Sequence, residues 1–235
     1  MQTCYIKEIF ASIQGEAHYI GEKQLFIRFC DCNLNCTYCD TDFQRENSFP
    51  IHDLNKTEQN PISSEKLAEI ANQHKVETVS LTGGEPLLHK DFLIEFLPKL
   101  NNKKIYLETN GILFDELNAI IDYVNVVSMD IKLPCSTNQK ARFEENRNFI
   151  KVATQNKKEI FAKIILDKNY SKEEIVKTVE LLKEFDIPLI IQPMDCRNKV
   201  NELNQKDMIN LLDFILEIYP KTRLIPQVHK YLKLL

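Results

Sequence analysis

Six short apolar runs recur along the 235-residue chain, and segments with the apolar spacing of amphipathic helices separate them. Runs rich in Val, Ile and Leu suit strands that are buried on both faces, and strands that alternate with helices form parallel sheets. Six strand–helix units are too few for a closed eight-stranded barrel. We therefore expect an α/β fold, an open, partial (β/α)6-type barrel with a parallel sheet, in a single domain over residues 1–235. The expected strands are residues 24–29, 76–81, 104–109, 124–129, 160–166 and 188–192.

The remaining segments fit around these strands. An N-terminal strand and a polar insertion at about residues 43–61 come before the second run. A helix is expected over residues 63–75, because Ser63 is a good N-cap and Glu65 lies in the first turn. A second helix is expected over residues 205–219, which carry apolar residues at helical spacing. We expect this spacing to place five side chains in the core: Met208, Leu211, Leu212, Ile215 and Tyr219.

Polar residues gather directly after the expected strands. The first strand runs into a cysteine-rich loop at residues 30–41, and later strands end at residues 82–86, 109–111, 128–132 and 192–195. Parallel strands of a β/α barrel present their carboxyl ends at one rim, and catalytic groups gather there. These segments are therefore expected to form one functional site.

The composition of the chain excludes several classes of function. A net charge of −4 without a basic stripe argues against a nucleic-acid binder. No segment approaches the roughly 18 apolar residues needed to span a membrane, and no secretory signal is evident. We expect a cytoplasmic protein, in which the seven cysteines serve as metal ligands or chemical groups rather than as disulfides.

The loop at residues 30–41 contains Cys32, Cys36 and Cys39 in a C-x3-C-x2-C pattern, so that one tight loop can turn three thiolates toward a common point. A structural zinc site needs a fourth protein ligand, for which Cys30 is the nearby candidate. A cubane of four irons held by three thiolates instead leaves one iron open for an exogenous chelate. We interpret the remaining cysteines as buried or incidental thiols: Cys4, Cys30, Cys135 and Cys196.

The cysteine loop, followed after the second strand by Gly83-Gly84-Glu85-Pro86, resembles the radical S-adenosylmethionine superfamily over nearly the whole chain. The resemblance implies a [4Fe–4S] cluster on Cys32, Cys36 and Cys39, with S-adenosylmethionine bound to the open iron and cleaved to a 5′-deoxyadenosyl radical. No catalytic residue is expected beyond the cluster and this cofactor. The implied cofactor-binding residues are Tyr38, Asp40, Gly83, Gly84, Ser128, Asp130, Lys132, Gln192, Pro193, Met194 and Asp195.

The segment after the fourth strand departs from the common pattern. Many relatives carry a compact Ser-Pro-Lys there, whereas this chain reads Ser128-Met129-Asp130-Ile131-Lys132. The sequence leaves open whether Asp130, Lys132 or both contact the cofactor. An Asp-Ile-Lys at this position also resembles activating enzymes for glycyl-radical proteins, which gives an alternative function. A structural zinc-binding module is the second alternative.

Further segments resemble the 7-carboxy-7-deazaguanine synthase family. They are Gln14-Gly15-Glu16 with Arg28, Cys39-Asp40-Thr41, Gln192-Pro193-Met194-Asp195 and the closing stretch RLIPQVHKYLKLL. Ala17 departs from the glycine that relatives often carry after Gln-Gly-Glu. The resemblance implies a carbon–nitrogen lyase of queuosine and deazapurine biosynthesis. Its reaction would contract the ring of 6-carboxy-5,6,7,8-tetrahydropterin to 7-carboxy-7-deazaguanine with loss of ammonia.

The same resemblance implies ligands and partners. The guanidinium fork of Arg28 suits the pterin carboxylate, Thr41 would bind Mg²⁺, and the Leu235 carboxylate would reach the pterin. A small-molecule pterin substrate, a reducing partner such as flavodoxin or ferredoxin, and a homodimer are expected. The substrate-binding residues implied are Ile13, Gln14, Gly15, Glu16, Arg28, Thr82, His229 and Leu235.

Overall fold

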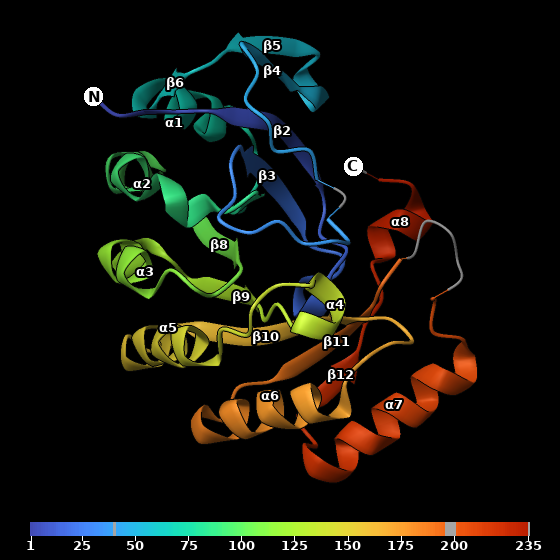
Figure 1. The fold of residues 1–235 in the computed structure, drawn as a ribbon. Coiled ribbons are helices and arrows are strands. Elements are labelled where there is room, and N and C mark those ends of the chain that lie inside the picture. Colours follow the sequence, from blue (N-terminus) through green and yellow to red (C-terminus); the bar gives the residue numbers. More distant parts are fainter. Residues whose placement is uncertain (40, 196–200, 235) are drawn as a thin grey trace.

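The computed structural model describes residues 1–39, 41–195 and 201–234 (Figure 1). Its main sheet, within these residues, has ten strands in the order β12-β11-β10-β9-β8-β7-β3-β2-β4-β5. From β3 to β12 all neighbours in this order run parallel, and β2 runs antiparallel to β3. The parallel strands are β3 (Lys23–Phe29), β7 (Thr78–Gly83), β8 (Lys104–Thr109), β9 (Val126–Asp130), β10 (Glu159–Leu166), β11 (Leu189–Pro193) and β12 (Thr222–Leu224).

The six strands expected from the apolar runs are confirmed, and β12 is an addition to them. Strand β12 pairs with β11 in parallel, with Thr222 opposite Leu189. It is three residues long and contains the exposed Arg223, so it has neither the length nor the apolar character of the other runs. The strand order of the sheet, with β12 at one edge and β5 at the other, fits the expected open α/β fold with a parallel sheet.

The N-terminal side of the sheet is richer in strands than the sequence predicted. Strand β2 (Ile6–Ile13) is the expected N-terminal strand. The polar insertion contributes β4 (Ser48–Ile51) and β5 (Lys56–Gln59), which extend the sheet beyond β2. Strand β4 buries Phe49 and Ile51 on one face, an alternation too short to stand out among its polar neighbours. Strands β1 (Thr3–Cys4) and β6 (Ile62–Ser63) form a separate antiparallel pair.

One layer of helices follows the sheet from strand to strand, as Figure 1 shows. It consists of α1 (Ser64–Gln73), α2 (Lys90–Phe96), α3 (Phe114–Ile120), α5 (Phe143–Gln155), α6 (Lys172–Phe185) and α7 (Gln205–Ile218). Two short helices, α4 (Pro134–Thr137) and α8 (Val228–Leu232), lie apart from this layer. Single turns of 3-10 helix occur at Ala17–Tyr19, His52–Leu54, Pro86–His89, Leu97–Lys99 and Ile121–Tyr123.

Both helices expected from the sequence are present, and α1 begins at its predicted cap. The Ser63 side chain accepts a hydrogen bond from Lys66 N at 3.2 Å, which satisfies a free N–H of the first turn of α1. Asn204 and Asp207 form a capping box at the start of α7. Of the residues expected in the core, Leu211, Ile215 and Tyr219 are buried, whereas Met208 and Leu212 are partly buried against it.

The main core lies between the sheet and the helical layer. Val79, Leu107, Val127 and Ile164 come from the centres of four successive strands and are fully buried. This packing fixes the strands and so places the loops at their carboxyl ends. Among the described residues, no helix combines the length and the apolar character that a membrane span requires.

Candidate active site

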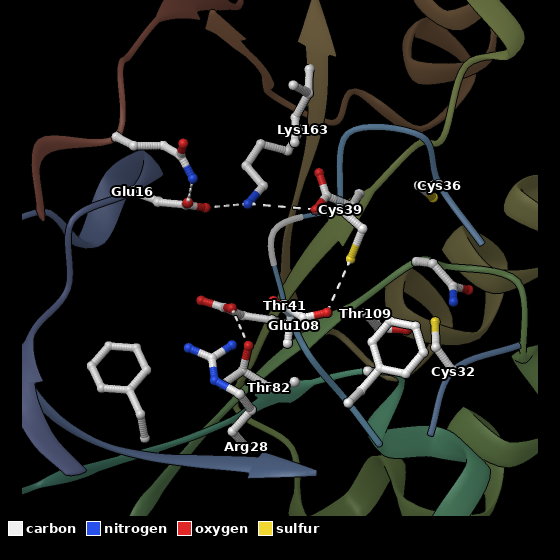
Figure 2. A pocket seen from close by; sticks show the side chains of 18 of the residues that line it. Glu16, Arg28, Cys32, Cys36, Cys39, Thr41, Thr82, Glu108, Thr109 and Lys163 are labelled. Atoms are coloured by element: carbon white, nitrogen blue, oxygen red, sulfur yellow. Dashed lines mark hydrogen bonds and ion pairs between the residues drawn. The ribbon is translucent and has the colours of Figure 1, made fainter. Parts of the chain in front are cut away.

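A cavity of about 500 Å³ lies at the carboxyl ends of the parallel strands. Figure 2 shows Cys32 and Cys36 on one side of it and Glu16 on the opposite side, with Cys39 and Thr41 between. The structure therefore brings together, at the expected rim, segments that are far apart in the sequence. The predicted site residues that line the cavity are Ile13, Gln14, Gly15, Glu16, Arg28, Cys32, Cys36, Tyr38, Cys39, Thr41, Thr82, Gly83, Gly84, Asp130, Lys132, Gln192 and His229.

Four predicted cofactor residues are not part of the cavity lining. Ser128 is two residues deeper in β9 than Asp130 and is only 2% exposed. Pro193 and Met194 continue β11 past the lining residue Gln192. Asp195 forms an ion pair with Lys230 of α8 at 3.2 Å. The assignment of these four residues to the cofactor therefore stays a prediction. Two predicted residues, Asp40 and Leu235, lie outside the described residues.

The cysteine loop separates the three lining thiols from Cys30. Cys30 is fully buried beneath the loop, where its Sγ donates to the Gln44 carbonyl oxygen at 3.5 Å. Cys32 and Cys36 are partly buried, and this burial raises the pKa of the Cys32 thiol to about 11 and also raises that of Cys36. Cys39 is exposed, and its N–H donates to the Cys36 carbonyl oxygen at 3.1 Å. This arrangement favours three thiol ligands and not four.

The described residues contain no group of three or more His, Cys, Asp or Glu side chains positioned to hold one metal ion. A cubane distributes its thiolates over separate iron atoms, so its ligands need not converge on one point. Cys32, Cys36 and Cys39 all line the cavity and are of the type and number that such a cluster takes.

The paired glycines after β7 pack against the strand that leads into the cysteine loop. A Cβ on Gly84 would lie 1.7 Å from the Asp31 carbonyl oxygen, and one on Gly83 would lie 2.4 Å from the Phe29 carbonyl oxygen. Gly83 also has a φ of +117°, a conformation that side chains rarely adopt. The sequence suggested that these glycines let a cofactor approach the backbone. The structure adds a packing reason, because they let two loops meet.

Both candidates at the end of β9 lie in the cavity wall. Lys132 donates to Asp130 Oδ2 at 3.0 Å and to the Tyr38 hydroxyl at 3.1 Å. Burial opposes the charge on Lys132, but Asp130 and Tyr38 together hold its pKa well above the ordinary value. Burial raises the pKa of Tyr38 to about 12. Asp130 and Lys132 thus form an ion pair, and both act electrostatically on Cys36.

Arg28 enters the cavity from β3 and is held by a residue that the sequence did not single out. Its Nε donates to Glu8 Oε1 at 2.8 Å, and the other oxygen of Glu8 lies 2.8 Å from His52 Nε2. The guanidinium carbon lies 5.7 Å from the centre of the Phe10 ring, which stacks on Phe26. Glu8 is opposite Arg28 in the β2–β3 ladder, a pairing that appears only once the strand register is known.

A second missed residue, Glu108, joins two predicted ones. It accepts hydrogen bonds from Gln14 Nε2 at 3.1 Å and from the Thr82 hydroxyl at 2.7 Å. Figure 2 shows Thr82 and Glu108 beside Arg28. A carboxylate within the apolar run at residues 104–109 was a signal that could have identified it.

Lys163 is a third missed residue and lies between two predicted ones. Its ammonium group forms a hydrogen-bonded ion pair with Glu16 and lies 3.6 Å from Asp130 Oδ2 (Figure 2). Burial opposes ionisation of Glu16, but Lys163 and a hydrogen bond from Gln227 outweigh it and lower the pKa of Glu16 to about 2. A lysine inside the apolar run at residues 160–166 was again an available signal.

The C-terminal segment closes the cavity against the Gln14-Gly15-Glu16 turn. Val228 N donates to the Gly15 carbonyl oxygen at 2.8 Å, and Gln227 Nε2 donates to Glu16 Oε1 at 2.7 Å. A Cβ on Gly15 would lie 2.4 Å from His229 Nδ1. His229 therefore reaches the cavity because residue 15 has no side chain.

Two buried oxygens in the cavity wall lack a partner among the described residues. They are Asp130 Oδ1 and Gln192 Oε1, acceptor atoms of two side chains that line the cavity. Buried acceptors without donors are costly, so they favour a ligand that presents hydroxyl, amino or ammonium groups. S-adenosylmethionine and a pterin both carry such donors. The residues present therefore fit these groups.

Comparison with known proteins assigns the class. Residues 26–212 match the family model of the radical SAM superfamily, and the chain belongs to that superfamily. The fold agrees with the crystal structure of QueE from Escherichia coli, with a TM-score of 0.62 and 18% identity over 97% of this chain and 95% of that one. It also resembles native anSMEcpe with bound AdoMet, with a TM-score of 0.54 and 20% identity over 80% of this chain and 59% of that one.

The sequence places the chain in one family of this superfamily, that of the 7-carboxy-7-deazaguanine synthases. It is 32% identical to the 7-carboxy-7-deazaguanine synthase of Geobacter sulfurreducens, over 97% of this chain and 96% of the relative. It is 36% identical to that of Archaeoglobus fulgidus, over 96% of each chain. The family expected from the sequence is therefore confirmed.

Proposed function

We propose that this protein is a 7-carboxy-7-deazaguanine synthase, which contracts the ring of 6-carboxy-5,6,7,8-tetrahydropterin with loss of ammonia. The observation that carries the proposal is that three cysteine thiols line the same cavity of about 500 Å³ as Arg28, Gln14 and Glu16. A radical-generating centre and a carboxylated, amide-bearing substrate would thus share one space. Membership of the synthase family supports the same conclusion.

On the cofactor wall, Cys32, Cys36 and Cys39 would hold a [4Fe–4S] cluster whose open iron binds S-adenosylmethionine. When bound, this pair supplies a 5′-deoxyadenosyl radical. Asp130 Oδ1 and Gln192 Oε1 would accept hydrogen bonds from the donors of S-adenosylmethionine. The other proposed cofactor contacts, all in the cavity wall, are Tyr38, Gly83, Gly84 and Lys132.

On the substrate wall, Arg28 would bind the pterin carboxylate. Glu8 accepts a hydrogen bond only from Nε of Arg28. The two terminal Nη groups of Arg28 make no hydrogen bond to the described residues, so they remain available to bind a carboxylate in a bidentate manner. The Gln14 amide would accept from and donate to the amide edge of the pterin, and the carboxylates of Glu16 and Glu108 would accept hydrogen bonds from its amino groups. These residues hold the substrate in register, and the cofactor supplies the reactive species.

Other parts of the proposal rest on the sequence and the family. Thr41 lines the cavity and would provide a hydroxyl ligand to Mg²⁺, a cation that prefers oxygen ligands and keeps several waters. A flavodoxin or ferredoxin would supply the electron. A homodimer in the cytoplasm is the expected form of the enzyme.

The proposal is tested by anaerobic turnover. Reconstituted protein with dithionite and S-adenosylmethionine is expected to convert 6-carboxytetrahydropterin to 7-carboxy-7-deazaguanine without net consumption of S-adenosylmethionine. Consumption of one S-adenosylmethionine per radical placed on a partner protein, with free pterin ignored, would instead indicate an activating enzyme. Colourless protein with about one zinc per chain would indicate a zinc-binding module.

A further inference from the structure

A continuous chain of polar contacts crosses the cavity wall from the C-terminal segment to the end of β9. Gln227 donates to Glu16, Glu16 pairs with Lys163, Lys163 lies 3.6 Å from Asp130, and Asp130 accepts from Lys132 at 3.0 Å. Lys163 is the central member. It is also directly opposite Asp130 in the parallel β9–β10 ladder.

Lys163 reaches this position from the interior of the sheet and not from a loop. Its side chain is 6% exposed, and that of Glu16 is 13% exposed. The β10 strand on which it stands is buried between β9 and β11, so its backbone is fixed. Glu16, in contrast, lies in an irregular turn followed by Ala17 at a φ of +53°. A cation fixed on β10 thus holds the Glu16 side chain. Separate hydrogen bonds hold the backbone of the turn, from Gln14 N to the Glu22 carbonyl oxygen and from Val228 N to the Gly15 carbonyl oxygen, both at 2.8 Å.

We propose that Lys163 is a positioning residue, which fixes the Glu16 carboxylate on the substrate wall and the Asp130 carboxylate on the cofactor wall at a set separation. The inference rests on the proposed function for the names of the two walls, but the contacts themselves do not depend on it. Without the ammonium group, two carboxylates would face each other across the space that it fills. The turn at residues 13–17 would then lose the ion pair that ties Glu16 to β10.

The loss of Lys163 should also make Glu16 sensitive to pH. The groups that face Glu16 are Lys163 from β10, Gln227, which precedes α8, and His229 in α8. With Lys163 present, Glu16 stays ionised at any assay pH, because its pKa is lowered to about 2. With the cation removed, burial is opposed only by Gln227 and His229, so the pKa of Glu16 rises and the neutral form gains population as the pH falls.

The first test uses no ligand. Hydrogen–deuterium exchange of residues 13–17 is compared in the wild-type protein, Lys163→Gln and the control Lys221→Gln, whose exposed ammonium pairs with Asp186 at a distant surface. Exchange in this turn is expected to be at least about tenfold faster in Lys163→Gln and unchanged in the control. Equal exchange in all three proteins would overturn the inference.

The second test measures affinity for the stable analogue pterin-6-carboxylate by its fluorescence. Lys163→Gln is expected to bind at least about tenfold more weakly at pH 8, with a further loss at pH 6 that the wild type does not show, and Lys163→Arg should recover most of the affinity. An affinity within about twofold of the wild type at both pH values would contradict the inference.

The two tests distinguish a failure of the proposed function from a failure of the role inferred for Lys163. If the wild type itself does not bind the pterin, the proposed function fails, and the exchange of residues 13–17 still decides the role of Lys163. If Lys163→Gln does not fold, Glu16→Gln/Lys163→Gln removes both charges together. This double variant is expected to fold, to exchange rapidly at residues 13–17 and to bind the pterin without the added pH dependence. Slow exchange there would overturn the inference.

Discussion

A methyl group on Gly84 would lie 1.7 Å from the carbonyl oxygen of Asp31, the residue that precedes the first thiol ligand. Gly84→Ala must therefore displace the start of the cysteine loop, because the obstructing atom belongs to the backbone. We expect iron content after anaerobic reconstitution to fall well below the roughly four per chain of a full cluster. Gly21→Ala is the matched control, since its Cβ would meet nothing within 4 Å. It should cost about 1 kcal/mol of stability through its positive φ and leave the iron content unchanged.

The separation of Cys30 from the other three thiols predicts which cysteine can be removed. Cys36→Ala should lose the brown cluster absorbance and essentially all turnover, because one iron loses its ligand. Cys30→Ala, which removes a buried thiol bonded only to the Gln44 carbonyl oxygen, should keep its iron and its activity. Iron analysis and the anaerobic product assay distinguish the two variants. Full activity in Cys36→Ala would contradict both the cluster assignment and the proposed reaction.

Binding of the pterin carboxylate by Arg28 should require the planar shape of the guanidinium group as well as its charge. Arg28→Lys keeps a positive charge but loses the planar fork and its Nε contact with Glu8, so KM for the pterin should rise by about tenfold or more. KM for S-adenosylmethionine should stay the same. The corresponding change on the outer helix α5, Arg147→Lys, affects a surface ion pair and should leave both constants unchanged.

Burial raises the pKa of the Glu85 carboxyl group to about 7, although it accepts hydrogen bonds from the Thr109 hydroxyl and from Asn110 N. A carboxyl group with a higher pKa in the folded chain binds its proton more tightly there. The free energy of unfolding should therefore fall as the pH rises from about 4.5 to about 7, by at most about 1.4 kcal/mol per pH unit.

Urea unfolding of the metal-free protein at several pH values measures this slope. Glu85→Gln has no carboxyl group to titrate, so its slope between pH 5 and 7 should be smaller than that of the wild type. The variant also loses one acceptor, and for that reason the comparison concerns slopes and not absolute stability. Identical slopes would show that Glu85 keeps an ordinary pKa in the folded chain.

The parallel part of the sheet was predictable because its strands are buried on both faces and so appear as continuous apolar runs. Strand β4 was missed because only Phe49 and Ile51 are buried in it, and β12 because it is three residues long. Strand β12 is an edge of the sheet and β4 is next to the other edge, β5, and strands there need little apolar sequence. Their positions depend on tertiary packing that local pattern does not encode.

The site residues were predictable where the functional groups lie close together in the sequence. Three cysteines within eight positions remain together in any fold, and Cys32, Cys36 and Cys39 do line one cavity. Glu8, Glu108 and Lys163 were missed because each pairs with a side chain on a neighbouring strand, and that pairing depends on the fold. Two of them were visible as charges inside apolar runs, a signal of a compensated buried group. Ser128 was expected at the cavity but lies two residues too deep in its strand.

The hydrogen bond between Glu16 and Gln227 joins residues that are 211 positions apart. A ribosome delivers the chain from its N-terminus, so the cysteine loop leaves the exit tunnel long before residues 227–229 are synthesised. During that interval Gly15 and Glu16 lack the partners that they have in the folded protein, Val228 and Gln227. The contacts that cover this side of the cavity can therefore form only after the cysteine loop and the parallel strands have been synthesised.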